Sequence, residues 1–177
     1  MSEPGRVRDH ATRLVRMTGR DPSESHPSAT PLELLFDLAF VVAFAQAGDL
    51  LAHGIGDGHA AASVLGFVFG ILTTCWAWVN YAWFASAYDT DDWFFRIVTM
   101  VQIVGVVVFA LGMPAFGATI EAPYVDSSVA VAGYVVMRVA MVAHWLRAAV
   151  EDPERRRTAL SYAFFVGTGQ LAWVAIT

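Results

Sequence analysis

Residues 94–113 read FFRIVTMVQIVGVVVFALGM, an apolar run whose one charged side chain, Arg96, lies near its start. A helix of about 20 residues rises about 30 Å, which matches the thickness of the hydrocarbon core of a bilayer. Further apolar runs of similar length lie on both sides of this one. The predicted fold class is therefore all-α: a polytopic transmembrane helix bundle of about five spanning helices.

The chain divides into a polar tail and a transmembrane domain. Residues 1–30 contain five arginines and several Pro and Ser residues, but no apolar segment of the kind that a cleaved signal peptide needs. We interpret them as an Arg-rich flexible cytoplasmic tail. Residues 31–177 are predicted to form the helical domain, with spans at 31–53, 60–88, 94–113, 127–150 and 158–177. The short segments between these spans carry Gly, Pro or charged residues, as turns do.

Composition excludes several classes of protein. Hydrophobic residues make up 56% of the chain and charged residues 15%, and the mean hydropathy is +0.52, which is too apolar for an ordinary soluble domain. The net charge of −5 forms no basic patch, so we expect no nucleic-acid partner. Cys75 is the only cysteine, and no Cys/His cluster accompanies it. We therefore expect no metal and no cofactor.

The arginines predict the orientation of the chain in the membrane. They occur in the tail, at Arg96 and at residues 155–157, while the segments 54–59 and 114–126 contain none. Cytoplasmic loops retain Arg and Lys during insertion, so the N-terminus is predicted to be cytoplasmic. The chain ends at Thr177 without a polar tail after the last apolar run, which we interpret as a truncated chain.

Three charged residues predict a polar site inside the membrane. Glu33 and Asp37 lie four residues apart, hence on one helical face, and Arg138 lies near the middle of the fourth span. A lone guanidinium at that depth is costly, and a bidentate pair with Asp37 would satisfy both groups. Two alternatives stay open: Glu33 simply stabilises its helix N-terminus, and the Asp37–Arg138 pair only fixes helix packing.

A second group of charges follows the second span. Asp89, Asp91 and Asp92 precede Arg96 and are predicted to form a charged cluster on the cytoplasmic side. Three acids in four residues can hold a hard cation, but a solvated loop whose arginine balances the local charge is the favoured interpretation.

Uncharged polar residues within the spans are expected to make contacts between helices. Asn80, Gln46 and Gln102 are the principal candidates, since side-chain amides hydrogen-bond across helices in membranes. His144 lies six residues after Arg138 and does not share its helical face. No second histidine is expected at a matching depth, which argues against haem.

Three blocks of sequence indicate a family. They are PLELLFDLAFVVAFAQ (residues 31–46), WAWVNYAWFASAYDTDD (residues 76–92) followed by Arg96, and YVVMR (residues 134–138). With these blocks in this order, the chain resembles the low temperature requirement protein A (LtrA) family of bacterial membrane proteins.

The resemblance implies a multi-pass protein of the bacterial inner (plasma) membrane, linked by name to growth in the cold, with no molecular activity to transfer. Family members look about twice as long, so the chain resembles an N-terminal half. The family tends to have two aromatic residues before the acid of the first block, where this chain has Leu35 and Phe36. Glu33 and Asp37 are both present at the matching positions.

The sequence leaves two hypotheses for the function. The first is a transporter or channel-like component that uses the intramembrane Asp/Glu–Arg site. The second is a structural or cold-stress membrane protein whose charges only fix helix assembly. An enzyme is the least favoured class, because no nucleophile–base pair, metal set or phosphate loop is present, and we assign no catalytic residue. The expected partners are the lipid bilayer and either a second copy or a missing C-terminal half.

Overall fold

The computed structural model describes residues 14–17, 19, 30–88, 90–119 and 122–176. Five helices follow one another: α2 (Pro31–Gly56), α3 (Ala60–Ala87), α4 (Trp93–Thr119), α5 (Ser128–Glu151) and α6 (Arg156–Ile176). These helices confirm the predicted all-α fold class, and each predicted span corresponds to one of them.

Four of the helices, α2 to α5, are long and apolar enough to cross a membrane. Large apolar side chains cover their outer surfaces, and Leu38, Leu65, Leu72 and Leu111 are each more than half exposed. Such a surface is stable in lipid, where it faces acyl chains instead of water. The chain is therefore an integral membrane protein, and the bilayer is the solvent for these faces.

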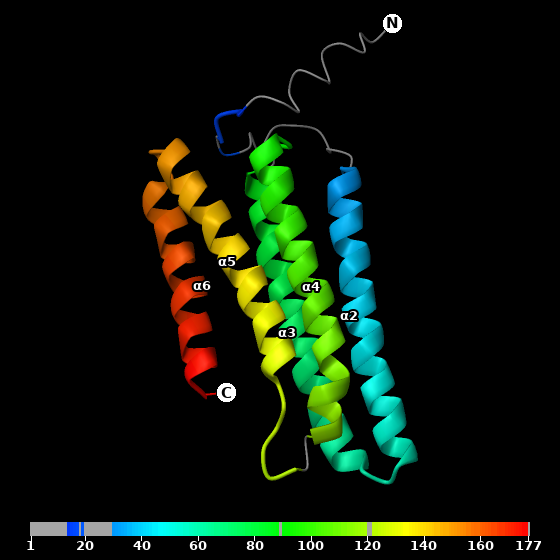
Figure 1. Ribbon diagram of the computed structural model, residues 1–177. Helices are drawn as coiled ribbons and strands as arrows, with labels where there is room; N and C mark the ends of the chain where they lie inside the picture. The colour runs from blue at the N-terminus through cyan, green and yellow to red at the C-terminus, as the bar shows by residue number, and fades with distance from the viewer. Residues whose placement is uncertain (1–13, 18, 20–29, 89, 120–121, 177) are drawn as a thin grey trace, which may run out of the picture.

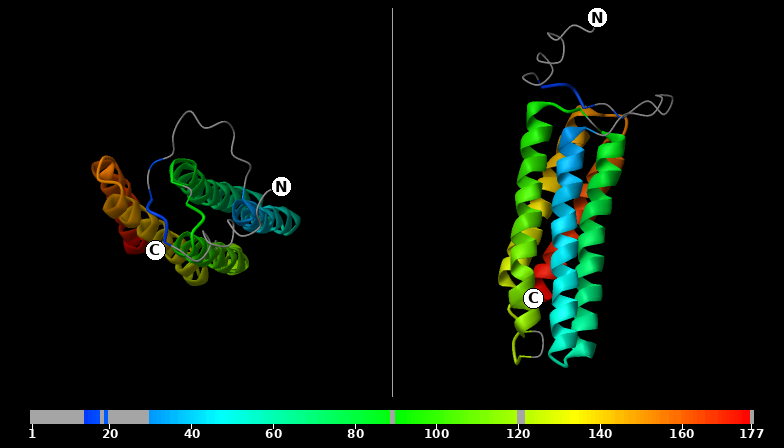
Figure 2. Two further views of the ribbon diagram at one scale, coloured as in Figure 1. Left: turned by 90° about the horizontal axis from the view of Figure 1, so that it is seen from above. Right: turned by 90° about the vertical axis from the view of Figure 1, so that its right-hand side faces the viewer.

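The helices run up and down (Figure 1), and α2 lies between α3 and α4 (Figure 2). α2 packs on α3 and α4, α4 packs most extensively on α5, and α6 packs on α5 (Figure 2). Residues 14–17, residue 19 and the α5–α6 turn lie at one end, which we call the α5–α6 end (Figure 1). The α2–α3 turn and the α4–α5 connection lie at the opposite end, which we call the α2–α3 end.

A capping box begins α2. Thr30 accepts a hydrogen bond from Glu33 N–H at 3.2 Å, and the Glu33 carboxylate accepts one from Thr30 N–H at 2.8 Å. Pro31 occupies the first helical position, where its missing N–H costs nothing. The sequence Thr-Pro-Leu-Glu therefore fixes this helix start through local hydrogen bonds.

α4 extends further than predicted. The third span was expected to end at Met113, but the helix continues through Pro114 to Thr119. Proline removes one helical hydrogen bond, and neighbouring groups in a membrane bundle can compensate for that loss. Residues 114–119 of the predicted loop are therefore helical, and α4 contains an internal proline.

α4 and α5 approach closely because glycines line their contact. A Cβ added at Gly133 would lie 2.3 Å from Phe109 N, and one added at Gly112 would lie 2.3 Å from Ala130 N. Small residues of this kind let two membrane helices meet backbone to backbone. The polar side chains of α4 and α5 are brought together by this contact.

Candidate functional site: buried polar groups between α3, α4 and α5

A buried ion pair joins the start of α4 to the end of α5. Asp92 precedes α4, and Arg147 donates two hydrogen bonds to its carboxylate, the one from Nη1 to Oδ1 at 2.8 Å. The side chains of Asp92 and Arg147 are 0% and 6% exposed. Asp92 also caps α4, since Phe95 N–H donates to Oδ1 at 2.9 Å. This bidentate geometry satisfies both charges away from water.

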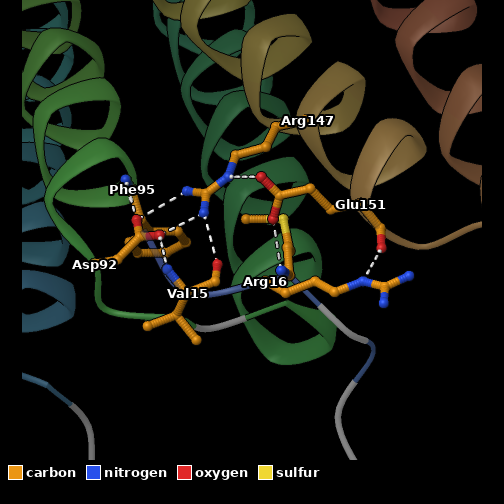
Figure 3. A network of polar contacts seen from close by, with 7 residues as sticks. Val15, Arg16, Asp92, Phe95, Arg147 and Glu151 are labelled. Carbon is orange, nitrogen blue, oxygen red and sulfur yellow. Dashed lines mark hydrogen bonds and ion pairs between the residues drawn. The ribbon is translucent and has the colours of Figure 1, made fainter. Parts of the chain in front are cut away.

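The same ion pair attaches residues 14–17 to the bundle (Figure 3). Arg147 donates to the Val15 carbonyl at 2.9 Å, and Val15 N–H donates to Asp92 at 3.1 Å. Arg147 Nε donates to Glu151 at 2.9 Å, and Glu151 accepts from Met17 N–H at 2.6 Å. We call Val15, Met17, Asp92, Arg147 and Glu151 the end network. It closes the α5–α6 end with backbone as well as side-chain groups.

Asp92 is held in its charged form. Burial by itself raises the pKa of Asp92, but hydrogen bonds from Arg147, Phe95 N–H and Val15 N–H outweigh burial and hold it below its usual value of 3.8. The neighbouring Asp152 shows the same balance. Burial raises the pKa of Asp152, but hydrogen bonds from Arg155 and Gly19 N–H lower it by more, so the pKa lies below its usual value of 3.8. Asp92 of the end network and the neighbouring Asp152 are therefore both negatively charged at neutral pH.

Three polar side chains from three helices meet deeper in the bundle. Tyr81 of α3 and Thr99 of α4 have their hydroxyl oxygens 3.4 Å apart, and Thr99 Oγ1 lies 3.3 Å from His144 Nε2 of α5. We call these residues the central triad. Tyr81 is 2% exposed, and the other two are fully buried. The rings of Phe84 and Phe95 lie 4.9 and 5.0 Å from the His144 ring, so the triad sits in an aromatic enclosure.

Two atoms near the triad lack hydrogen-bond partners among the described residues. They are His144 Nδ1 and Gln102 Oε1. The Gln102 amide nitrogen lies 3.9 Å from Met141 Sδ, and the side chain is 2% exposed. Gln102 therefore lies between α4 and α5, as expected for a helix contact, but its oxygen is left unsatisfied.

Arg138 lies nearer the α2–α3 end of α5. It is 5% exposed, donates to the Tyr134 hydroxyl, and places its guanidinium carbon 4.6 Å from the centre of the Tyr134 ring. Within the described part of the chain, no carboxylate lies within ion-pair distance of it. Arg138 is thus a buried guanidinium with a phenol as its partner instead of an acid.

The predicted Asp37–Arg138 pair is not formed. Asp37 is exposed on α2, where its carboxylate accepts a hydrogen bond from Trp78 Nε1 at 2.7 Å. α2 packs on α3 and α4, so the helix that carries Arg138 lies beyond its neighbours. The third member of that predicted site, Glu33, belongs to the capping box of α2. The three residues do not make one site in this structure.

The predicted cytoplasmic cluster separates into two parts. Asp91 forms a two-point ion pair with Arg96, with Nε and Nη2 at 2.9 and 2.7 Å, and both side chains are more than 40% exposed. Asp92 turns instead to Arg147, and Asp89 lies outside the described residues. The Asp91–Arg96 pair agrees with the solvated-loop interpretation, whereas Asp92 does not.

Asn80 and Gln46 occupy places different from the expected helix contacts. Asn80 is half-buried and donates to the Trp76 carbonyl of its own helix at 2.6 Å, and no bond from it to another helix is found among the described residues. Gln46 lines a cavity of about 670 Å³ at the α2–α3 end, together with Asp49, His53 and His59. We call this the α2–α3 cavity.

A second cavity lies between α3, α4 and α5. Its volume is about 440 Å³, and its walls are mostly apolar, with several aromatic rings. We call it the α4–α5 cavity; it is lined among others by Phe69, Thr73, Phe109, Phe116, Tyr124 and Tyr134. Tyr134 connects this cavity to Arg138, because its ring lines the wall and its hydroxyl accepts the Arg138 hydrogen bond.

Sequence reasoning missed the groups that meet at the centre and at the α5–α6 end. From the sequence, Arg147 was assigned no role, and His144 was considered only for haem. One available signal is depth, since Asp92 precedes the third span and Arg147 lies near the end of the fourth, which places both at the same end of the bundle. No comparable signal links Tyr81 or Thr99 to His144.

Comparison with known proteins supports the family suggested by the three sequence blocks. The family model described as bacterial low temperature requirement A protein (LtrA) matches residues 28–177. No curated protein and no solved structure matches the chain. The match includes all five helices and every residue of the central triad. The chain is therefore a multi-pass bacterial membrane protein and belongs to the LtrA family.

Proposed function

We propose that the protein is a non-enzymatic transporter or channel-like component of the bacterial membrane, with a pathway between α3, α4 and α5. The observation that carries this proposal is the series of buried polar groups in helices that cross the bilayer. It replaces the Asp37–Arg138 site as the candidate pathway.

The polar groups lie at successive depths along α5. Arg138 comes first from the α2–α3 end, Gln102 contacts α5 at Met141, His144 follows, and Arg147 completes the series. With a rise of 1.5 Å per residue, positions 138 to 147 cover about 14 Å of the helix. The series therefore covers about half of a hydrocarbon core of about 30 Å.

Unsatisfied polar atoms in this region favour a pathway over simple packing. A buried polar group without a partner costs free energy, and lipid offers no water to compensate. If these polar groups only held the helices together, each would be expected to have a hydrogen-bond partner, as the groups of the end network do. His144 Nδ1 and Gln102 Oε1 instead keep hydrogen-bonding capacity for a passing solute or proton.

The internal Pro114 of α4 supports the same proposal. Transporter sites are commonly built beside helices interrupted by Gly or Pro. Pro114 lines the α2–α3 cavity, and the neighbouring Met113 lines the α4–α5 cavity. Pro114 therefore lies inside a continuous helix, at the point where both cavities approach α4.

Flux into liposomes tests this proposal. Purified protein is reconstituted, proton entry is followed with trapped pyranine under a potassium diffusion potential, and anion entry is followed with labelled 4-butylbenzenesulfonate. We expect flux of at least one solute above that of protein-free liposomes, and a loss in Thr99→Val, which removes the hydroxyl at the centre of the triad. Asn80→Ala is the matched control and should keep the flux, because the Asn80 side chain is half-buried and bonds only the Trp76 carbonyl of its own helix among the described residues.

The absence of flux for both solutes, with folded protein in the membrane, would overturn the proposal. The second candidate function is then helix assembly alone, which the end network favours. There the charges of Asp92, Arg147 and Glu151 are fully used in joining α4, α5 and residues 14–17.

A further inference from the structure

Arg138 presents an electrostatic problem that the described residues do not solve. Arg138 is 5% exposed, and among the described residues its side chain donates one hydrogen bond, to the neutral Tyr134 hydroxyl. Removing an ion from water without a counter-charge costs several kcal/mol or more. The nearby Tyr134 ring offsets part of this cost by a cation–π contact. An anion would offset it more completely.

The α4–α5 cavity provides room for such an anion. Helical side chains lean towards the N-terminus of their helix, so Arg138 extends back towards Tyr134, whose ring lines the cavity. Arg138 contacts this ring and is not itself a lining residue, so an anion would reach it past Tyr134. The volume of about 440 Å³ falls within the usual range of small-molecule sites, about 300–1,000 Å³. Its aromatic walls suit an apolar body, and the hydroxyls of Thr73 and Ser127 are the few polar groups of the lining besides the tyrosines.

We propose that the α4–α5 cavity binds an amphipathic organic anion, with its apolar body against the aromatic wall and its charged group at Arg138. This inference rests on the proposed transport function and names the substrate class for the same pathway. Binding needs the anion to approach the guanidinium closely enough for charge-assisted hydrogen bonds with the free Arg138 donors.

The depth of Arg138 favours a free anion over the headgroup of a membrane lipid. Arg138 is ten residues from Ser128, the first residue of α5, which corresponds to about 15 Å along the helix. That distance brings it close to the middle of a hydrocarbon core of about 30 Å. A lipid phosphate stays in the headgroup layer, whereas a small anion can enter the cavity completely.

The test measures binding of 4-butylbenzenesulfonate to the protein in phosphatidylcholine nanodiscs by calorimetry. The sulfonate remains charged at neutral pH, and the uncharged 4-butylbenzenesulfonamide has nearly the same shape. We expect saturable binding of one sulfonate per chain, with the sulfonamide weaker by roughly tenfold or more because it cannot replace the missing counter-charge.

Two variants separate the charge from the cavity. Arg138→Gln should weaken sulfonate binding roughly tenfold or more while leaving the weak sulfonamide binding unchanged. Val131→Phe keeps Arg138 and fills part of the cavity, so it should weaken both probes. Arg96→Gln removes an exposed arginine away from the cavity and should bind both probes as the unmodified protein does.

Equal affinity for sulfonate and sulfonamide would overturn the inference, because the cavity would then select only apolar bodies. Unchanged sulfonate binding in Arg138→Gln would overturn it as well. Displacement of the sulfonate by added phosphatidylglycerol would assign the site to a lipid and overturn the choice of a free anion.

Arg138-dependent binding without flux would leave this inference standing and refute the transport function. Flux without saturable binding of the sulfonate would refute this inference and leave the transport function standing.

Discussion

At the residue scale, the Asp92–Arg147 pair is the clearest case of charges held for structure. Both side chains are almost completely buried, and each has its hydrogen-bonding capacity used by the partner or by residues 14–17. Losing one member leaves the other charge without compensation, which typically costs about 3–5 kcal/mol. The pair therefore tests the assembly role that the sequence assigned to Asp37 and Arg138.

We predict that Arg147→Gln lowers the unfolding free energy by about 3–5 kcal/mol, measured by thermal unfolding in detergent. The double variant Asp92→Asn with Arg147→Gln should recover part of this loss, since it removes both charges. Arg96→Gln breaks the exposed pair with Asp91 and should cost less than about 1 kcal/mol. A cost for Arg147→Gln no larger than for Arg96→Gln would contradict the buried pair.

The pKa of Asp92 predicts how stability depends on pH. A carboxyl whose pKa is lower in the folded protein contributes stability that is fully present above its unfolded value of 3.8 and is lost as the pH falls through the folded value. The stability difference between the unmodified protein and Asp92→Asn should therefore shrink below about pH 4. Unfolding midpoints of both proteins between neutral and acidic pH measure it. A difference that stays constant with pH would show that Asp92 is not held charged.

The sequence predicted that buried charges would need partners, but not which ones. Arg138 was paired with Asp37 from depth alone, and the order of helices across the bundle decides otherwise, because α2 packs on α3 and α4. Glu33 was easier to interpret, since its capping box is local in sequence. When a residue contacts a helix far away in the sequence, its partner could not be predicted without knowing how the helices pack.

At the element scale, the contact between α4 and α5 controls the site. Gly133 and Gly112 allow the backbones to meet, and the contact brings Thr99 and Gln102 against His144 and Met141. Pro114 does not end α4, although proline commonly ends a helix in sequence-based reasoning. The predicted end at Met113 was wrong because a membrane bundle tolerates an internal proline better than water does.

We predict that Gly133→Ala destabilises the protein by about 1–3 kcal/mol, because the new methyl group would meet Phe109 N at 2.3 Å and force the helices apart. Gly167→Ala is the matched control. A Cβ there meets nothing within 4 Å, so the change should be neutral or slightly stabilising through helix propensity. Thermal unfolding of the two variants compares them, and equal midpoints would argue against the close contact.

At the scale of the whole molecule, the fold places the α2–α3 turn and the α5–α6 turn at opposite ends (Figure 1). The number and place of the helices were predictable from apolar runs, and four of them, α2 to α5, are long and apolar enough to cross a bilayer. The position of α6 at the side of α5 was not predictable. It depends on contacts such as the stacked rings of Trp145 and Tyr162, which are 4.5 Å apart.

The orientation remains a prediction that cysteine labelling can test. In a Cys75→Ala background, Asp57→Cys and Glu154→Cys place one thiol at each end of the bundle. With a cytoplasmic N-terminus, a membrane-impermeant maleimide should label Asp57→Cys in intact cells and Glu154→Cys only after the cells are opened. The opposite labelling pattern would reverse the orientation, and labelling of both in intact cells would contradict the fold.

The central claim is that the central triad and Gln102, unlike the end network, serve passage and not folding. The most direct test measures flux and thermal stability on one variant, Gln102→Leu. Leucine has a similar size and removes an amide whose oxygen has no partner among the described residues. We predict unchanged or higher stability, because an unsatisfied group is removed, together with loss of flux in liposomes. Reduced stability with flux preserved would contradict the account and assign these groups to helix assembly.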